Sequence, residues 1–343
     1  MSRDGRPLVS VRDLKVHFPV YGGVLRHKIG SVKAVDGVSF DLRRGEVLGL
    51  VGESGSGKTT VGRAIANLLR AMSPDVHLEG SILLDTQDGP VDLNGLRRRD
   101  MNRHRAVIQL IFQDPYSSLN PRMTVQGLIE RPLKLHTTLS RQEREERVLG
   151  LLDRVGLQPE YANRYPHEFS GGQRQRIGIA RALATRPVLI IADEPVSALD
   201  VSVQAQVINL MQELRADFGL TYVFVAHDLS VVYHISDRIA VMYLGNIVEL
   251  GTAEQVYKHP RHPYSKALLS SVPMPDPRHD TSGRIRLEGD IPTPLAKPSG
   301  CGFRTRCPIA RAECARDAPF LEDVGDGQLV ACPYADEEPP AAS

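Results

Sequence analysis

The chain has 343 residues, of which 42 are Lys or Arg and 41 are Asp or Glu, so its formal net charge is +1. This balance argues against a domain that wraps nucleic acid, since such domains are strongly basic. The length predicts one large domain with an appended segment. No run approaches the roughly 18 apolar residues of a membrane span, and the N-terminus lacks the apolar core of a secretion signal, so we expect a cytoplasmic protein.

The first part of the chain has the pattern of strands. Residues 8–12 and 38–42 alternate apolar and polar side chains, and a Gly-rich stretch over residues 21–31 separates them. Such alternation is typical of half-buried strands. We therefore predict a small antiparallel sheet that leads into a core.

A phosphate-binding motif follows. Residues 47–51 predict a buried strand, and residues 59–70 have the apolar spacing of a helix. The loop between them fills every fixed position of the pattern G-x-x-x-x-G-K-[ST]. In that geometry backbone N–H groups face the phosphates at a helix N-terminus, Lys58 reaches the β- and γ-phosphates, and the Thr59 hydroxyl binds Mg²⁺. The expected nucleotide contacts are Gly52, Ser54, Gly55, Ser56, Gly57, Lys58, Thr59 and Thr60.

The middle of the chain is polar at first and then helical. Residues 85–105 are rich in Arg and predict a solvated loop or helix face. Residues 107–112 predict a strand. Ser140 and Glu143 have the spacing of a capping box, so we predict a helix that begins there.

Two apolar runs end at polar residues suited to catalysis. Residues 187–192 predict a central strand covered on both faces, and residues 220–226 repeat the pattern before His227. Ligands bind at the carboxyl ends of strands in open α/β sheets. We expect Asp193 to hold Mg²⁺ and Glu194 to orient and deprotonate the water that attacks the γ-phosphate.

A second anion cradle is predicted after Phe169. A Ser and two glycines leave backbone N–H groups exposed at the start of a helix, which is an anion site. One γ-phosphate does not need two anion sites in the same chain. The second anion site therefore implies a dimer, in which it contacts the nucleotide bound to another subunit. The residues are Ser170, Gly171, Gly172 and Gln173.

The end of the chain predicts a hairpin and an extension. Residues 239–250 are typical of a closing hairpin with Gly245 and Asn246 as its turn. The density of Pro, Gly and charge rises beyond Pro273, which predicts a domain boundary between residues 260 and 280.

Six motifs occur in the order and approximate spacing of an ABC transporter ATP-binding subunit, which the chain resembles over about residues 8–273. They are the phosphate loop, Gln113, the 170–173 segment, Asp193-Glu194, residues 197–200 and His227. The resemblance implies that Gln113 touches Mg²⁺ and couples the site to a transmembrane partner. It also implies that Asp200 crosses the dimer interface and that His227 contacts the γ-phosphate. Phe18 resembles the aromatic that stacks on adenine, with Tyr21 as the alternative.

The same resemblance implies an α/β fold of the P-loop NTPase class, with a RecA-like core, an antiparallel β subdomain and a helical subdomain at about residues 116–186. We assign residues 1–265 to the ABC ATPase domain. Residues 266–343 form a small C-terminal extension that contains the cysteines.

Finer features are similar to one branch of the family. Residues 114–121 and 262–269 resemble the dipeptide/oligopeptide importer ATPases, and residues 300–308 are similar to their C-terminal extension. Within that branch, residues 18–32 and 219–222 resemble the subunit that pairs with a distinct second ATPase.

All four cysteines lie in the extension, separated by five, six and seventeen residues. This spacing does not fit the paired C-x₂₋₄-C of ordinary zinc sites. Four thiolates in a reducing cytosol suit an iron–sulfur cluster or a zinc ion better than disulfides. The resemblance favours a structural [4Fe–4S] cluster, with zinc or unligated thiols as alternatives. The ligands would be Cys301, Cys307, Cys314 and Cys332.

The resemblance implies an ATPase, with ATP and Mg²⁺ as cofactors, that powers import of di- or oligopeptides. It would lie peripherally on the cytoplasmic face of the plasma membrane. The expected partners are a second ATPase subunit in a heterodimer, two transmembrane permease subunits and a substrate-binding protein, with no nucleic acid. The alternatives are the same role for nickel, glutathione or a glycan, and a soluble ABC ATPase that acts on nucleic acid or the ribosome.

Overall fold

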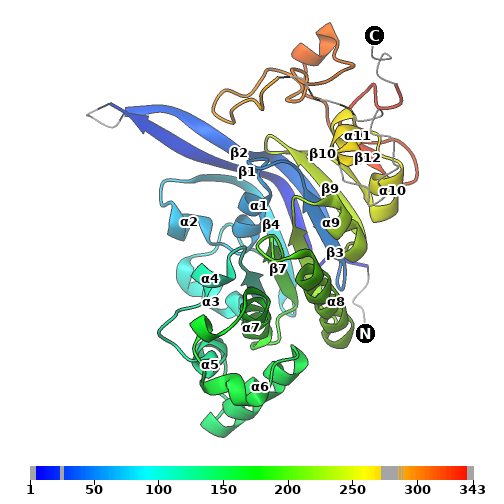
Figure 1. Ribbon diagram of the computed structural model, residues 1–343. Coiled ribbons are helices and arrows are strands. Elements are labelled where there is room, and N and C mark those ends of the chain that lie inside the picture. The colour runs from blue at the N-terminus through cyan, green and yellow to red at the C-terminus, as the bar shows by residue number, and fades with distance from the viewer. Residues whose placement is uncertain (1–4, 24–26, 272–284, 286, 288, 338–343) are drawn as a thin grey trace. The chain divides into compact units, whose positions relative to one another are not determined.

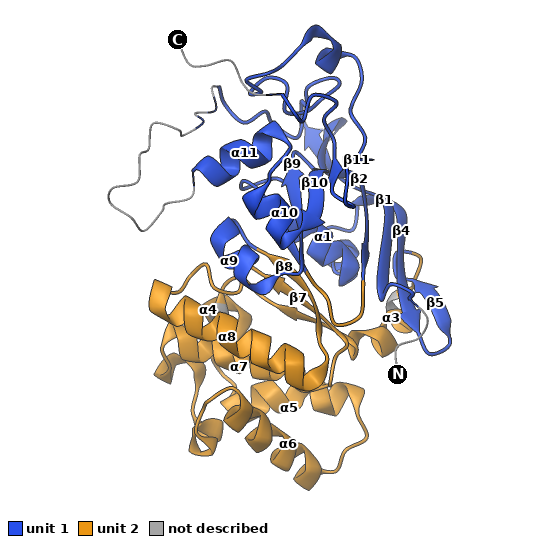
Figure 2. Ribbon diagram, turned by 90° about the vertical axis from the view of Figure 1, so that its right-hand side faces the viewer, with its two compact units in different colours: residues 1–42, 48–94, 226–343 blue, residues 43–47, 95–225 orange. Residues whose placement is uncertain are grey.

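The computed structural model describes residues 5–23, 27–271, 285, 287 and 289–337 and consists of two compact units (Figure 2). Unit 1 comprises residues 1–42, 48–94 and 226–343, and unit 2 comprises residues 43–47 and 95–225. Along the chain, unit 2 is therefore inserted into unit 1. Each unit has its own strands and helices.

An antiparallel sheet of unit 1 contains the strands β1 Val9–Gly22, β2 His27–Leu42, β4 His77–Thr86 and β5 Gly89–Asp92. Their order is β2-β1-β4-β5, and β1 and β2 form one long ribbon (Figure 1). This confirms the predicted antiparallel sheet. The interruption expected over residues 21–31 is shorter than predicted: β1 ends at Gly22, β2 begins at His27, and these two residues pair with each other. Gly30 accepts extended backbone within the ladder, whereas Gly23, which follows the last pair, has φ 71°.

A second set of strands in unit 1 runs in the order β11-β12-β10-β9-β3. The bounds are β3 Val47–Val51, β9 Arg238–Tyr243, β10 Asn246–Thr252, β11 Glu322–Asp323 and β12 Leu329–Val330. Residues 48–51 pair in parallel with β9, and all of β3 is buried, as predicted.

The hairpin of β9 and β10 is confirmed, but its turn lies one residue earlier than expected. Tyr243 pairs with Asn246, so Leu244 and Gly245 form the turn. Both have positive φ, 44° and 81°, which is the backbone of a tight two-residue hairpin turn.

The helices of unit 1 are α1 Lys58–Ile65, α2 Leu69–Met72, α9 Leu229–Ile235, α10 Ala253–Lys258, α11 Pro263–Ser270 and the 3₁₀ turn η4 Ala312–Ala315. The single helix predicted over residues 59–70 was wrong, because it divides into α1 and α2. Asn67 between them has φ 52°, a left-handed conformation that ends a helix, and its side-chain amide donates to the Leu93 carbonyl.

The C-terminal segment is attached to β10 of unit 1. Strand β12 pairs with β10, and the amide of Gln328 donates to the Glu249 carboxylate at 2.7 Å. Glu249 is fully buried and also accepts the backbone N–H groups of Arg261 and His262. A buried carboxylate is stable only with such partners, so Glu249 joins three segments of unit 1.

Unit 2 has three parallel strands in the order β8-β7-β6, with bounds β6 Ile108–Ile111, β7 Leu189–Asp193 and β8 Thr221–Val225. All three confirm predicted strands. The helices are α3 Arg98–Arg105, α4 Pro115–Ser118, α5 Val125–His136, α6 Arg141–Arg154, η1 Pro159–Asn163, η2 Pro166–Glu168, α7 Gly171–Leu183 and α8 Val201–Phe218. Helix α6 begins with the predicted capping box of Ser140 and Glu143.

The predicted α/β class is confirmed. The domain limits at residue 265 and at residues 116–186 stay predictions; residue 265 lies inside α11. Part of the expected boundary region, residues 272–280, lies outside the described residues. Among the residues that are described, no helix combines the length and apolar character needed to cross a bilayer.

Candidate functional site

The phosphate loop connects β3 to α1 in unit 1 and has room only for glycine at two positions. A Cβ on Gly52 would lie 2.1 Å from the Met242 carbonyl oxygen, and one on Gly57 would lie 2.2 Å from that of Ala34. Both have positive φ, 147° and 104°. Gly55, by contrast, faces open space. A close-fitting loop with an open face before a helix N-terminus fits a bound phosphate.

Lys58 is held by the loop that it is expected to serve. Its ammonium donates to the carbonyls of Gly52 and Glu53 at 2.7 and 2.9 Å, and its side chain is buried. Ser56 is buried nearby, with its hydroxyl 3.3 Å from the ammonium. Thr59 and Thr60 follow in the first turn of α1. The loop therefore holds the ammonium inside the phosphate loop. A bound phosphate would replace one or both carbonyl oxygens as the acceptor of its hydrogen bonds.

In unit 2, two of the predicted catalytic residues meet after β7. Asp193 is the last residue of β7 and is 2% exposed. Glu194 follows with φ 46°, an uncommon conformation for a side chain of its size, and its Oε2 accepts from the Gln113 amide at 2.8 Å. The two consecutive carboxylates have different surroundings, because Asp193 is buried and Glu194 is half-buried.

The second predicted cradle forms a complete capping box at the start of α7. The Gln173 N–H donates to the Ser170 hydroxyl at 3.3 Å, and the Ser170 N–H donates to the Gln173 side chain at 3.0 Å. Gly172 has no room for a side chain, since its Cβ would lie 2.4 Å from Val203. Gly171 is half-buried, and a Cβ placed on it would lie 3.4 Å from the Leu199 side chain, whereas Ser170 before it is exposed.

Asp200 is the N-cap of α8. Its carboxylate accepts from the Ser202 hydroxyl at 2.7 Å and from the Val203 N–H at 3.0 Å. These hydrogen bonds lower the pKa of Asp200, so the carboxylate is ionised at neutral pH. An exposed, charged cap is compatible with the expected contact across a subunit interface.

The remaining predicted nucleotide contacts lie in unit 1. His227 is exposed, two residues after the end of β8. Phe18 is half-buried and Tyr21 is 43% exposed, and both belong to β1. The choice between the two aromatics as the adenine partner stays a prediction.

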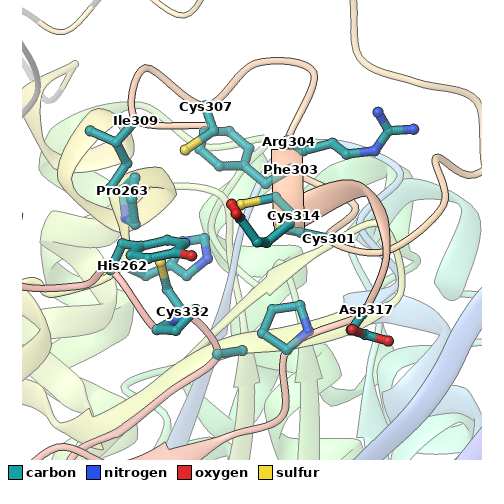
Figure 3. A pocket seen from close by; sticks show the side chains of 15 residues that line it. His262, Pro263, Cys301, Phe303, Arg304, Cys307, Ile309, Cys314, Asp317 and Cys332 are labelled. Atoms are coloured by element: carbon teal, nitrogen blue, oxygen red, sulfur yellow. The ribbon is translucent and has the colours of Figure 1, made fainter. Parts of the chain in front are cut away.

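The four cysteines gather around one cavity of about 220 Å³ in unit 1 (Figure 3). Burial raises the pKa of the Cys307 thiol to about 11 and also raises the pKa of the Cys301 and Cys332 thiols. These thiols are therefore protonated at neutral pH unless a cation favours the thiolates. Within the described part of the chain, no group of three or more His, Cys, Asp or Glu side chains is arranged to hold a metal ion.

The comparison with known families identifies the class of protein. The ABC transporter family matches residues 35–197, and the family described as oligopeptide/dipeptide transporter, C-terminal region, matches residues 248–314. The oligopeptide transport ATP-binding protein AppF of Bacillus subtilis is 52% identical over 327 residues, covering 95% of this chain and 96% of its own. The chain belongs to the ABC transporter family. It is an ABC-type ATPase, as its motifs imply.

Further relatives agree with this ABC ATPase assignment. The oligopeptide transport ATP-binding protein OppF of Salmonella typhimurium is 54% identical over 319 residues, which are 92% of each chain. Among solved structures, the dimeric post-hydrolysis state of the ATP-binding cassette MJ0796 bound to ADP and Pi is 28% identical, with a TM-score of 0.60. It covers 71% of this chain, and 98% of that chain is matched.

Two contacts of the phosphate loop are absent from the sequence-based predictions. The Glu53 N–H donates to the Tyr264 hydroxyl at 2.8 Å, and the Glu53 carboxylate pairs with Arg306. These partners lie 211 and 253 positions away in the chain. No pattern in the sequence of this ABC ATPase indicates either pairing.

His262 gives the folded ABC ATPase a predicted dependence on pH. Burial lowers its pKa from 6.5 to about 3. As pH falls below 6.5, the unfolded chain binds a proton that the folded chain does not, so stability falls by up to about 1.4 kcal/mol per pH unit. In the wild type the Tyr264 N–H donates to His262 Nδ1 at 3.1 Å. His262→Asn keeps an acceptor for this N–H but replaces the imidazole with a group that does not titrate.

The urea midpoint of the wild type is therefore expected to approach that of His262→Asn, or to cross it, between pH 7 and pH 5. Urea unfolding followed by circular dichroism at several pH values measures the two midpoints. Parallel curves for the two proteins across this range would contradict the burial of a neutral imidazole.

Proposed function

We propose that this chain is the ATP-hydrolysing subunit of an oligopeptide importer. The observation that carries the proposal is a complete phosphate loop in a chain whose residues 248–314 match the C-terminal region of oligopeptide/dipeptide transporters. The relatives named above are oligopeptide transport ATP-binding proteins, which supports the same cargo class.

The residues of each unit have distinct tasks in this proposal. The phosphate loop and Lys58 bind the β- and γ-phosphates, and Thr59, Gln113 and Asp193 hold Mg²⁺. Glu194 deprotonates the attacking water, and His227 contacts the γ-phosphate. The first turn of α7 in a second subunit completes the site, with Ser170, Gly171, Gly172 and Gln173 or their equivalents and with Asp200 at the interface.

We also propose a peripheral location on the cytoplasmic face of the membrane. The partners are a second ATPase subunit, two transmembrane permease subunits and a substrate-binding protein. Purification of the tagged chain from detergent-solubilised membranes tests this: the expected partners are two permeases and a second ATPase chain. Recovery with RNA or ribosomes, and without permeases, would instead support the soluble ABC ATPase class.

We propose that the four thiols around the cysteine cavity bind a [4Fe–4S] cluster with a structural role; in the described part of the structure no three of them are yet placed to hold a metal ion, so binding would have to draw them together. Four thiols line the cavity, which is the ligand number such clusters take, and a volume of about 220 Å³ exceeds what a single ion needs. When bound, the cluster would cross-link segments of the extension. Thiols of raised pKa must lose protons to bind it, so the metal and the thiolates stabilise one another.

Elemental analysis of anaerobically purified protein tests the cluster. We expect about four iron and four sulfide per chain and a broad absorption band near 400 nm. Cys307→Ser is expected to lose most of the iron, whereas a change of the exposed Glu145 to Gln is expected to keep it. About one zinc per chain, or neither metal, would reject the cluster without affecting the ATPase assignment.

A further inference from the structure

We propose that Arg306 is a positioning residue for the phosphate loop. It ties Glu53, the second residue of that loop, to the segment that carries Cys301 and Cys307. Order in the cysteine segment would then set the affinity of the loop for nucleotide. The inference rests on the assignment of residues 52–59 as the ATP site.

The ion pair between the two residues is bidentate and largely withdrawn from water. Arg306 Nη1 lies 2.7 Å from Glu53 Oε2, and Nη2 lies 3.1 Å from Oε1. The side chains are 8% and 26% exposed. Paired N–H donors on one carboxylate fix its orientation as well as its charge. The Arg306 guanidinium also lies beside Tyr243, with Nη1 3.5 Å from the hydroxyl.

A second path joins the same segment to the same loop residue. Phe303 is 1% exposed, lines the cysteine cavity, and packs on Tyr264 with ring centroids 5.4 Å apart. The hydroxyl of Tyr264 accepts the Glu53 N–H. Cys301, Phe303 and Arg306 belong to one short turn, in which the Arg306 N–H donates to the Phe303 carbonyl at 2.9 Å.

Glu53 is thereby held through all of its polar groups. Its carboxylate meets Arg306, its N–H meets Tyr264, and its carbonyl accepts from the Lys58 ammonium. Lys58 is the residue expected to contact the β- and γ-phosphates. A loop fixed in this way before the ligand arrives loses less conformational entropy on binding, which raises affinity.

The dependence is reciprocal. If order in the cysteine segment strengthens nucleotide binding, then nucleotide must stabilise the cysteine segment by the same factor. In this proposal the extension stabilises the conformation of the phosphate loop and thereby raises its affinity for nucleotide.

The test compares full-length proteins purified anaerobically: wild type, Arg306→Gln, Glu53→Gln, the double variant and Arg306→Lys. Arg304→Gln is the matched control, because Arg304 belongs to the same turn but donates to Ser299, and Figure 3 shows its guanidinium pointing away from the cysteines. The first readout is hydrogen exchange of the amides of residues 52–57 without nucleotide. The second is the affinity for Mg²⁺ with a fluorescent ATP analogue.

Arg306→Gln and Glu53→Gln are each expected to speed exchange in the loop and to weaken nucleotide affinity by about 5- to 150-fold, the usual range of coupling between sites. The double variant should be no weaker than the worse single variant, because both remove one interaction. Arg306→Lys keeps the charge but loses the paired geometry, so its effect should be intermediate. Arg304→Gln should match the wild type.

The proposal would be overturned if Arg306→Gln left both the hydrogen exchange of the loop and its nucleotide affinity unchanged. Tighter nucleotide binding by Arg306→Gln would also overturn it, as would a loss of affinity in the double variant equal to the sum of the two single losses. A wild-type protein that binds no nucleotide would contradict the ATP site itself. The exchange comparison needs no nucleotide, so it decides the role of Arg306 separately.

Discussion

Replacing Glu194 with Gln is expected to lower the rate of ATP hydrolysis by about 10²- to 10⁴-fold, the usual contribution of a general base. The amide cannot take the proton of the attacking water. It can still accept from the Gln113 amide, which lies 2.8 Å from the carboxylate, so the local geometry should persist. MgATP should therefore bind with nearly unchanged affinity, and the closed dimer should accumulate.

The measurement is single-turnover hydrolysis by the complex isolated with its membrane partners, together with size-exclusion chromatography of the isolated chain in MgATP. Glu145→Gln on α6 is the control, since its side chain is exposed on another helix. Full hydrolysis by Glu194→Gln would show that another group is the base.

Replacing Lys58 with Ala is expected to act on binding itself. A hydrogen bond to a charged group contributes about 1.5–3 kcal/mol, so affinity for MgATP should fall about 10- to 150-fold. The change also removes the donor to the carbonyls of Gly52 and Glu53, so the free loop should become more mobile.

Titration of a fluorescent ATP analogue measures the affinity, and a thermal melt without nucleotide shows whether the fold persists. Lys258→Ala on α10 is the matched control, because its exposed ion pair with Glu254 should matter little. Equal affinities of Lys58→Ala and Lys258→Ala for the ATP analogue would contradict a contact between Lys58 and the phosphates.

Local sequence patterns predicted most of the elements that surround the site. The strand before the phosphate loop, the strand that ends at Asp193 and the capping box at Ser140 are as expected, because each depends on neighbours in the chain. The helix after the loop was predicted too long, since a side-chain contact between Asn67 and the distant Leu93 carbonyl accompanies the break. Propensity alone does not register such a contact.

The candidate site also contains residues that the sequence predicted and contacts that it did not. Gln113 and Glu194 were named from motifs, and the structure brings their side chains together across 81 positions. The pairing of Glu53 with Arg306 spans 253 positions. In the sequence, each of the two residues is indistinguishable from an ordinary solvent-exposed charge. Only the fold reveals that the cysteine segment touches the phosphate loop.

The most direct test of the central claim is peptide uptake by cells that lack the gene for this chain. A radiolabelled pentapeptide, labelled glutathione, a labelled oligosaccharide and ⁶³Ni²⁺ serve as parallel cargoes, with the wild-type gene or the Glu194→Gln variant supplied on a plasmid. We expect pentapeptide uptake to be lost on deletion, restored by the wild type and not restored by the variant. Pentapeptide uptake that survives deletion, while uptake of another cargo is lost, would contradict the assignment of this ATPase to oligopeptide import.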